Sequence, residues 1–152
     1  MGMDLEGLKP TSPEGADFRL NVWHWRPVAD LVLDLFPKET AACEYWHSND
    51  GDGLDAEQSG KLADAIEQAL ESGEIADYAA AREARLKALP LEPCSFCGGA
   101  GTRHLDGGTI ASCNVCDGEG KRKSTETWYV LNLESVKAFA KFLRASGGFA
   151  IY

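Results

Sequence analysis

The feature that most constrains this chain is an eight-residue pattern, Cys-x-x-Cys-x-Gly-x-Gly, which occurs as CSFCGGAG at 94–101 and again as CNVCDGEG at 113–120. A Cys-x-x-Cys turn presents two thiolates from one tight loop, and zinc in structural sites takes four such ligands at tetrahedral corners. The spacing Cys-x2-Cys-x15-Cys-x2-Cys is typical of four-cysteine zinc sites. We therefore predict one structural Zn²⁺ per chain, bound by Cys94, Cys97, Cys113 and Cys116.

The main alternative for these cysteines is a redox dithiol. Thioredoxin-like motifs carry one pair at the start of a helix, whereas both pairs here occur in glycine-rich segments. Four cysteine ligands leave no coordination position for water, so we expect a structural metal and no Lewis-acid chemistry. The fifth cysteine, Cys43, has no cysteine or histidine at ligand spacing, and we expect it to be a buried thiol outside the metal site.

Residues 101–112, GTRHLDGGTIAS, separate the two cysteine pairs and predict a β-hairpin that turns at Asp106, Gly107 and Gly108. Such a hairpin would bring the two pairs together. Four glycines of the repeats are expected to adopt positive φ, so that backbone amides near each loop turn toward the sulfur atoms: Gly99, Gly101, Gly118 and Gly120.

The two repeats resemble those of the cysteine-rich domain of DnaJ-type cochaperones, which carries four such repeats and binds two zinc ions. The resemblance covers about residues 94–120. Two repeats imply one zinc, ligated by the same four cysteines, and a role in protein contacts. The sequence has no His-Pro-Asp tripeptide, the signature with which a J domain stimulates Hsp70, so the resemblance implies no cochaperone function.

Charge is distributed unevenly along the 152 residues, whose net charge is −9. Residues 1–90 carry eight Lys and Arg against eighteen Asp and Glu, whereas residues 91–152 carry seven against six. An acidic field repels phosphates and favours a basic partner, so a protein partner is expected and nucleic acid is disfavoured. The sequence contains no run of about 20 apolar residues and no signal-peptide pattern at its start, so we expect no membrane partner and a cytoplasmic location.

Changes in composition and hydrophobic pattern along the chain predict an α+β fold in four parts. A flexible arm is expected over residues 1–17, which are rich in glycine, proline and acidic residues, and a helical region over 18–90. The short links between its helices predict a small bundle, and the helices are expected at about 27–36, 39–47, 55–72 and 74–89. The third should begin with Asp55 as its N-cap.

The remaining two parts are a zinc-binding module over residues 91–125 and a strand-helix-strand tail over 126–152 that packs on the rest. In the tail, ETWYVLN predicts a strand, LESVKAFAKFLRAS predicts an amphipathic helix, and GFAIY predicts a terminal strand. Asn132 is the expected N-cap of that helix.

Two other stretches invite a functional interpretation. HSNDGDGLDAE alternates Asp and Gly, but three positions fail the EF-hand pattern, and an ordinary loop before a capped helix is favoured. NVWHWRP favours core packing by Trp23 and Trp25, with an aromatic binding patch as the alternative. If a second site exists, its candidates are His24, His47, Asp50 and Asp52.

Three functions follow from these patterns. We favour a zinc-stabilised protein-interaction module, a small regulator or adaptor of the kind that phage and bacterial genomes encode. The second is a nucleic-acid-binding zinc ribbon that uses Lys121, Arg122 and Lys123. The third is an enzyme with a site near the two histidines and two aspartates just named. An enzyme is disfavoured because the sequence has no phosphate loop, Gly-x-Ser-x-Gly or His-Glu-x-x-His, so we predict no catalytic residues.

Overall fold

The computed structural model describes residues 2–152 and confirms the predicted α+β class. The chain divides into two compact units. Unit 1 consists of Met1–Arg82 and Tyr129–Tyr152, and unit 2 consists of Glu83–Trp128. Unit 2 is therefore an insertion within the sequence of unit 1.

A four-stranded antiparallel sheet organises unit 1. Its strands follow the order β2-β1-β8-β3, so that β1 lies between β2 and β8. These strands are β1 (Gly2–Gly7), β2 (Asp17–Asn21), β3 (Gly53–Asp55) and β8 (Gly148–Ile151). The C-terminal strand β8 thus lies between β1 and β3, and both come from the first 55 residues.

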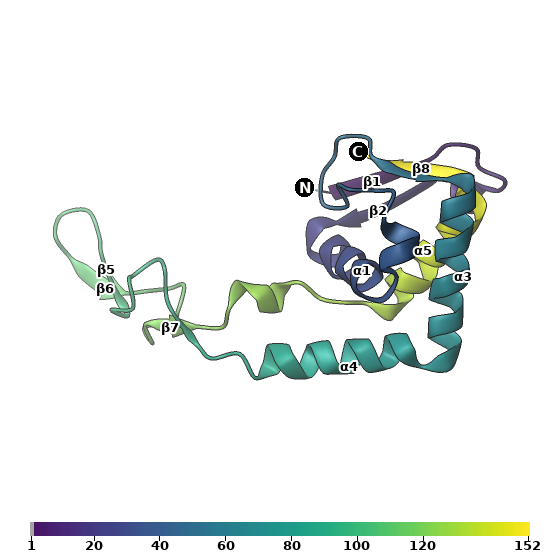
Figure 1. The fold of residues 1–152 in the computed structure, drawn as a ribbon. Helices are drawn as coiled ribbons and strands as arrows, with labels where there is room; N and C mark the ends of the chain where they lie inside the picture. Colours follow the sequence, from purple (N-terminus) through teal and green to yellow (C-terminus); the bar gives the residue numbers. More distant parts are fainter. Residues whose placement is uncertain (1) are drawn as a thin grey trace. The chain divides into compact units, whose positions relative to one another are not determined.

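Helices cover one face of this sheet: α1, α3 and α5 lie on the same side of β1, β2 and β8 (Figure 1). The helices are α1 (Val22–Leu35), α2 (Pro37–Thr40), α3 (Ala56–Ser72), α4 (Glu74–Lys87) and α5 (Leu133–Ser146), and a 3-10 turn, η1, covers Pro13–Gly15. None of the helices within residues 2–152 is both long enough and apolar enough to cross a membrane.

Aromatic side chains form the centre of the core between sheet and helices. Phe149 of β8 lies 5.9 Å from the Trp46 ring and 6.3 Å from the Phe139 ring, measured between centroids. The indole N–H of Trp25 donates to the Trp46 carbonyl at 2.8 Å, so this buried polar group is satisfied. Burial of each such side chain stabilises the fold by about 1.5–3 kcal/mol.

The capping signals read from the sequence are confirmed. The Asp55 side chain accepts the Gln58 N–H at 2.8 Å, and the Gln58 side chain accepts the Asp55 N–H, which completes a capping box at α3. The Asn132 side chain accepts the Glu134 N–H at the start of α5. These caps fix where the two helices α3 and α5 begin.

Three expectations about unit 1 are wrong in detail. Residues 1–17 were expected to be a flexible arm, but strand β1 lies within them, and its Met3 and Leu5 side chains are buried in the core. The first helix begins at Val22, where the Asn21 side chain accepts an N–H, and Pro27 lies inside it. The second helix is the single turn α2, which ends at Thr40. The N-terminal helices therefore pack on strands as well as on one another.

Unit 2 contains two small antiparallel ladders. The predicted hairpin is confirmed as β5 (Thr102–His104) paired with β6 (Ile110–Ser112), and β4 (Glu92–Pro93) pairs with β7 (Lys121–Arg122). The strand expected over ETWYVLN is wrong, because Thr125–Trp128 forms a 3-10 helix, η2.

Candidate metal centre

The two Cys-x-x-Cys turns bring four sulfur atoms together in unit 2. The Sγ atoms of Cys94, Cys97, Cys113 and Cys116 all lie within 4.8 Å of one another, and the Cys97 and Cys116 sulfurs are 3.8 Å apart. A tetrahedron with Zn–S bonds of about 2.3 Å has sulfur–sulfur edges of about 3.8 Å. The cluster is thus positioned to bind one metal ion.

The two repeats hold each other through matched backbone hydrogen bonds. The Cys94 N–H donates to the Gly120 carbonyl and the Cys113 N–H donates to the Gly101 carbonyl, both at 2.8 Å. The same glycines face the sulfurs: the Gly101 N–H lies 3.3 Å from the Cys97 sulfur, and the Gly120 N–H lies 3.2 Å from the Cys116 sulfur. Each repeat therefore positions one of its own cysteine sulfurs and is also bonded through its backbone to the other repeat.

Close packing explains why these two positions are glycine. A Cβ atom on Gly101 would lie 2.3 Å from the Gly118 carbonyl oxygen, and one on Gly120 would lie 2.3 Å from the Gly99 oxygen. Both residues also have positive φ, as the sequence predicted. The sequence interpretation missed Gly98 and Asp117, which share the position after the second cysteine and also have positive φ.

The thiols of the cluster differ in how readily they ionise. Burial opposes ionisation of Cys97, but amide N–H groups donated by Gly101 and Gly99 outweigh it and lower the pKa of this thiol to about 7. Burial raises the pKa of Cys116 to about 11, and hydrogen bonds among the clustered thiols add to this effect. Four thiolates this close repel one another, and a divalent cation among them would offset that repulsion.

Comparisons with protein-family models, curated proteins and solved structures give no match. The chemistry of the centre therefore rests on its own geometry. Four sulfur atoms within 4.8 Å of one another could complete the coordination shell of one soft divalent metal, and such a shell would leave no ligand position for substrate.

The cysteines also make up the interior of unit 2. Within Glu83–Trp128, all of which the structure describes, the buried cluster is Cys94, Cys113 and Cys116, with Cys97 and Val115 packed against it. Hairpin strands β5 and β6 have mostly exposed side chains. So small an interior buries too little apolar surface to hold the unit together, and a metal ion bound by the four cysteines would supply the missing cross-link.

The other candidate site residues make local contacts in place of a shared site. His24 Nδ1 lies 2.9 Å from the Asn21 side-chain oxygen, and His47 Nε2 lies 3.1 Å from an Asp30 oxygen. Among residues 2–152, no group of three or more potential metal ligands besides the cysteine cluster is brought together.

Asp50 and Asp52, in the loop that precedes α3, organise the backbone of that loop. Asp52 accepts N–H groups from Glu44 at 2.7 Å, Tyr45 at 2.9 Å and Gly53 at 2.9 Å, and Asp50 accepts the Ser48 hydroxyl. Hydrogen bonds from the Tyr45 and Gly53 amides hold the pKa of Asp52 below its usual value, despite some desolvation. This pattern is that of a structured loop before a capped helix.

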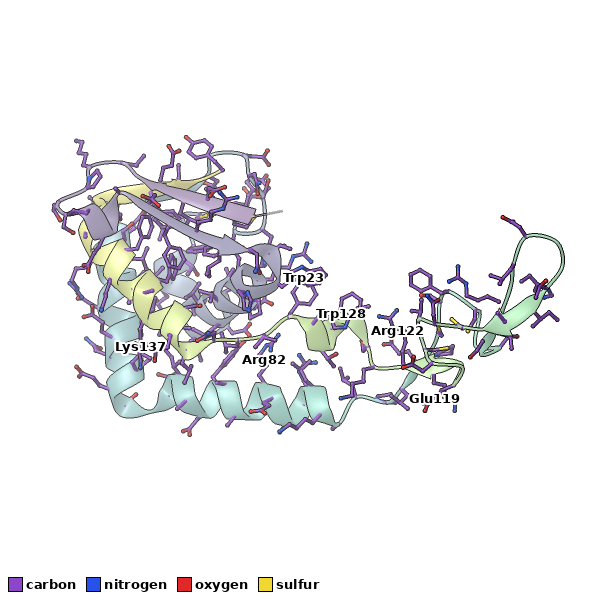
Figure 2. All side chains as sticks on the ribbon, turned by 180° about the vertical axis from the view of Figure 1, so that it is seen from behind. Trp23, Arg82, Glu119, Arg122, Trp128 and Lys137 are labelled. Carbon is purple, nitrogen blue, oxygen red and sulfur yellow. The ribbon has the colours of Figure 1, made fainter. Side chains whose placement is uncertain are left out.

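The tryptophans of NVWHWRP separate into two environments. Trp25 is fully buried in the core, as expected for packing. Trp23 is 39% exposed and lies 4.8 Å from the Tyr129 ring, over which the Arg26 guanidinium also lies at 5.5 Å. In unit 2, Arg122 lies over the Trp128 ring at 5.0 Å (Figure 2).

Cys43 is buried in unit 1, as the sequence predicted. Burial raises its pKa to about 12, and the nearby Asp52 carboxylate adds to this. At neutral pH we expect roughly a thousandfold less thiolate than in an ordinary cysteine, so iodoacetamide should not label Cys43 in the folded protein. Mass spectrometry of labelled native and denatured protein measures this, and native labelling at the rate of a free thiol would contradict it.

Proposed function

We propose that this chain is a zinc-stabilised protein-interaction module, a small regulatory or adaptor protein. Cys94, Cys97, Cys113 and Cys116 would bind one structural Zn²⁺. The observation that carries the proposal is the clustering of four sulfur atoms within 4.8 Å in a unit that has hardly any other interior. The resemblance of the repeats to the DnaJ-type cysteine-rich domain, which implies protein contacts, supports the same function.

Zinc is the metal that best fits these ligands. Soft thiolates in a tetrahedral arrangement select zinc or iron–sulfur centres, and zinc needs no inorganic sulfide and no redox partner. The ion would neutralise part of the thiolate charge and tie the two turns to each other. Its contribution would be to folding, because four protein ligands leave no position for a reacting water molecule.

Exposed apolar side chains on unit 2 support protein binding. Phe96, between the first two cysteines, and Ile110 of β6 are each 60% exposed, and Leu91 and Leu105 are also exposed. Exposed apolar groups on a rigid support are typical of surfaces that bind proteins. If a metal held the Cys94–Cys97 loop in place, Phe96 would be positioned for a partner although unit 2 has almost no apolar core.

The charges of the chain give little support to nucleic-acid binding. Unit 2 carries six Lys and Arg against six Asp and Glu, and unit 1 carries the whole excess of acidic residues. Arg122 is half-buried and lies over the Trp128 ring, which leaves Lys121 and Lys123 as the exposed members of the basic triplet. Two lysines would release few counterions from a nucleic acid.

The metal assignment is tested by zinc stoichiometry. Purified protein is expected to contain one zinc per chain, because four thiolates complete one shell. Cys113→Ser should lose most of the zinc, whereas the matched control Cys43→Ser should keep it. Elemental analysis of the three proteins gives the result. Two zinc ions per chain, or zinc loss in the Cys43→Ser control, would show the assignment to be wrong.

The interaction function is tested by capture of partners with zinc-loaded protein. A specific partner should be retained by the native chain and by Glu119→Gln, and lost at least tenfold by a Phe96→Ser, Ile110→Thr variant that keeps its zinc. Quantitative mass spectrometry of the bound fractions measures this. Submicromolar binding of mixed-sequence DNA or RNA by fluorescence anisotropy, abolished by replacing the basic triplet at 121–123 with alanine, would instead favour the nucleic-acid function.

A further inference from the structure

We propose that strand β2 is a self-association surface. It would pair antiparallel with β2 of a second copy of this chain, in the register centred on Phe18, and form a symmetric dimer. The inference goes beyond the proposed function and does not depend on the metal centre, because β2 belongs to unit 1.

Strand β2 lies at an edge of the four-stranded sheet. Among residues 2–152, the main-chain groups of Asp17–Leu20 make their backbone hydrogen bonds with β1, and no bond to another segment is seen. An edge strand offers its outer N–H and C=O groups to any strand that can pair with it. Proline and lysine are two of the residues with which native proteins block such edges, and β2 contains neither.

The charges of β2 are complementary to themselves. In the register centred on Phe18, Asp17 lies opposite Arg19 of the second copy, and Arg19 lies opposite Asp17 of the second copy. Opposite charges directly across an antiparallel pair stabilise it, and like charges destabilise it. The neighbouring register, centred on Arg19, would place two guanidinium groups opposite each other and is therefore disfavoured.

The apolar side chains of β2 favour the same register. Phe18 is partly buried, with its ring 5.4 Å from Phe139 and 5.7 Å from Phe142, so it belongs to the helix side of the sheet. Pairing centred on Phe18 would set the two Phe18 side chains opposite each other on that side. Their remaining exposed surface would be covered, and the two cores would become continuous.

The charged side chains emerge on the opposite, solvent-exposed face. Arg19 Nε already lies 3.2 Å from an Asp4 oxygen of β1. In the dimer each Arg19 would lie between Asp4 of its own chain and Asp17 of the second copy. The symmetric dimer would thus contain two equivalent sites, one on each side of the two-fold axis, in which one guanidinium lies between two carboxylates.

A five-residue strand buries much less area than a standard interface of about 1,600 Å², so the dimer should be weak. We expect a dissociation constant of about 10–500 μM, measured near 0.15 M salt so that the repulsion between two acidic chains is screened. Sedimentation equilibrium over a concentration series should show the average mass rising from one chain toward two.

Charge reversal tests the register. Asp17→Arg and Arg19→Asp should each weaken self-association by at least tenfold, because each sets like charges opposite one another. An equimolar mixture of the two variants should regain association, because every cross-strand pair between the two different chains would again join a cation to a carboxylate. Asp4→Asn is the control for loss of the ion pair within one chain, and it should still dimerise. Circular dichroism establishes that every variant is folded.

Three results would overturn the proposal. The first is a native chain that stays monomeric up to about 1 mM, a concentration above the whole range of dissociation constants expected here. The second is self-association of either charge-reversal variant at the native strength, which would place the contact elsewhere. The third is a mixture of the two folded variants that remains monomeric.

Discussion

Removal of zinc with a strong chelator is expected to disorder unit 2 and to leave most of the helical signal of unit 1 intact. The interior of unit 2 consists of the four cysteines and Val115, so the free energy of binding the proposed zinc would supply most of its folding free energy. Structural zinc sites contribute about 10–16 kcal/mol in small domains. Circular dichroism should therefore change little, whereas amide resonances of residues 94–120 should collapse to random-coil positions in heteronuclear NMR spectra.

The matched control is re-addition of zinc, which should restore the dispersed amide resonances. Cys113→Ser, prepared without chelator, should give the spectrum of the chelated native protein. Loss of the whole helical signal on chelation would mean that the two units fold as one. Unchanged resonances over 94–120 would mean that the backbone hydrogen bonds between the two repeats suffice without metal.

Phe149→Ala should have the opposite effect, with unit 1 strongly destabilised and zinc content unchanged. Phe149 is buried in the middle of the sheet, and its ring packs against Trp46, Phe139 and Phe142. Truncation of a buried phenylalanine costs about 3–5 kcal/mol, because transfer free energy is lost and a cavity remains. Urea unfolding monitored by far-ultraviolet circular dichroism measures the loss.

Tyr45→Ala is the control for this substitution, since Tyr45 is an aromatic residue of unit 1 whose side chain is largely exposed. It should change the free energy of unfolding by about 0.5 kcal/mol or less. If the urea concentration at the midpoint of unfolding were the same for Phe149→Ala and the native protein, β8 would contribute little to the core. Loss of zinc in that variant at low urea would show that unit 2 needs unit 1.

Elements with strong local signals could be predicted from the sequence. Helix α3 has a capping box at Asp55 and a glycine at its end, α5 has a cap at Asn132 and an apolar stripe, and the hairpin has two glycines at its turn. The four cysteines could be grouped because their spacing is itself the signal. In each case the residues that decide the structure are near one another in the chain.

Elements that depend on distant partners were missed. In β1, Met3 and Leu5 alternate with acidic residues, which is a strand pattern, but the strand is short and its glycines and acidic residues suggested a loose arm. Its partners are β2 and, far along the chain, β8. The strand expected over ETWYVLN failed for the converse reason, because aromatic and β-branched residues there find no neighbouring strand and Thr125–Trp128 coils instead.

The central place of β8 has a consequence for synthesis on the ribosome. Strand β8 pairs with both β1 and β3, so the sheet of unit 1 cannot close until residues 148–151 have emerged. All four cysteines of the cluster lie between residues 94 and 116 and emerge earlier. Contacts close in sequence form sooner than distant ones. Unit 2 is therefore expected to fold before β8 is available to complete the sheet of unit 1. Supply of zinc during translation would then precede completion of the larger unit.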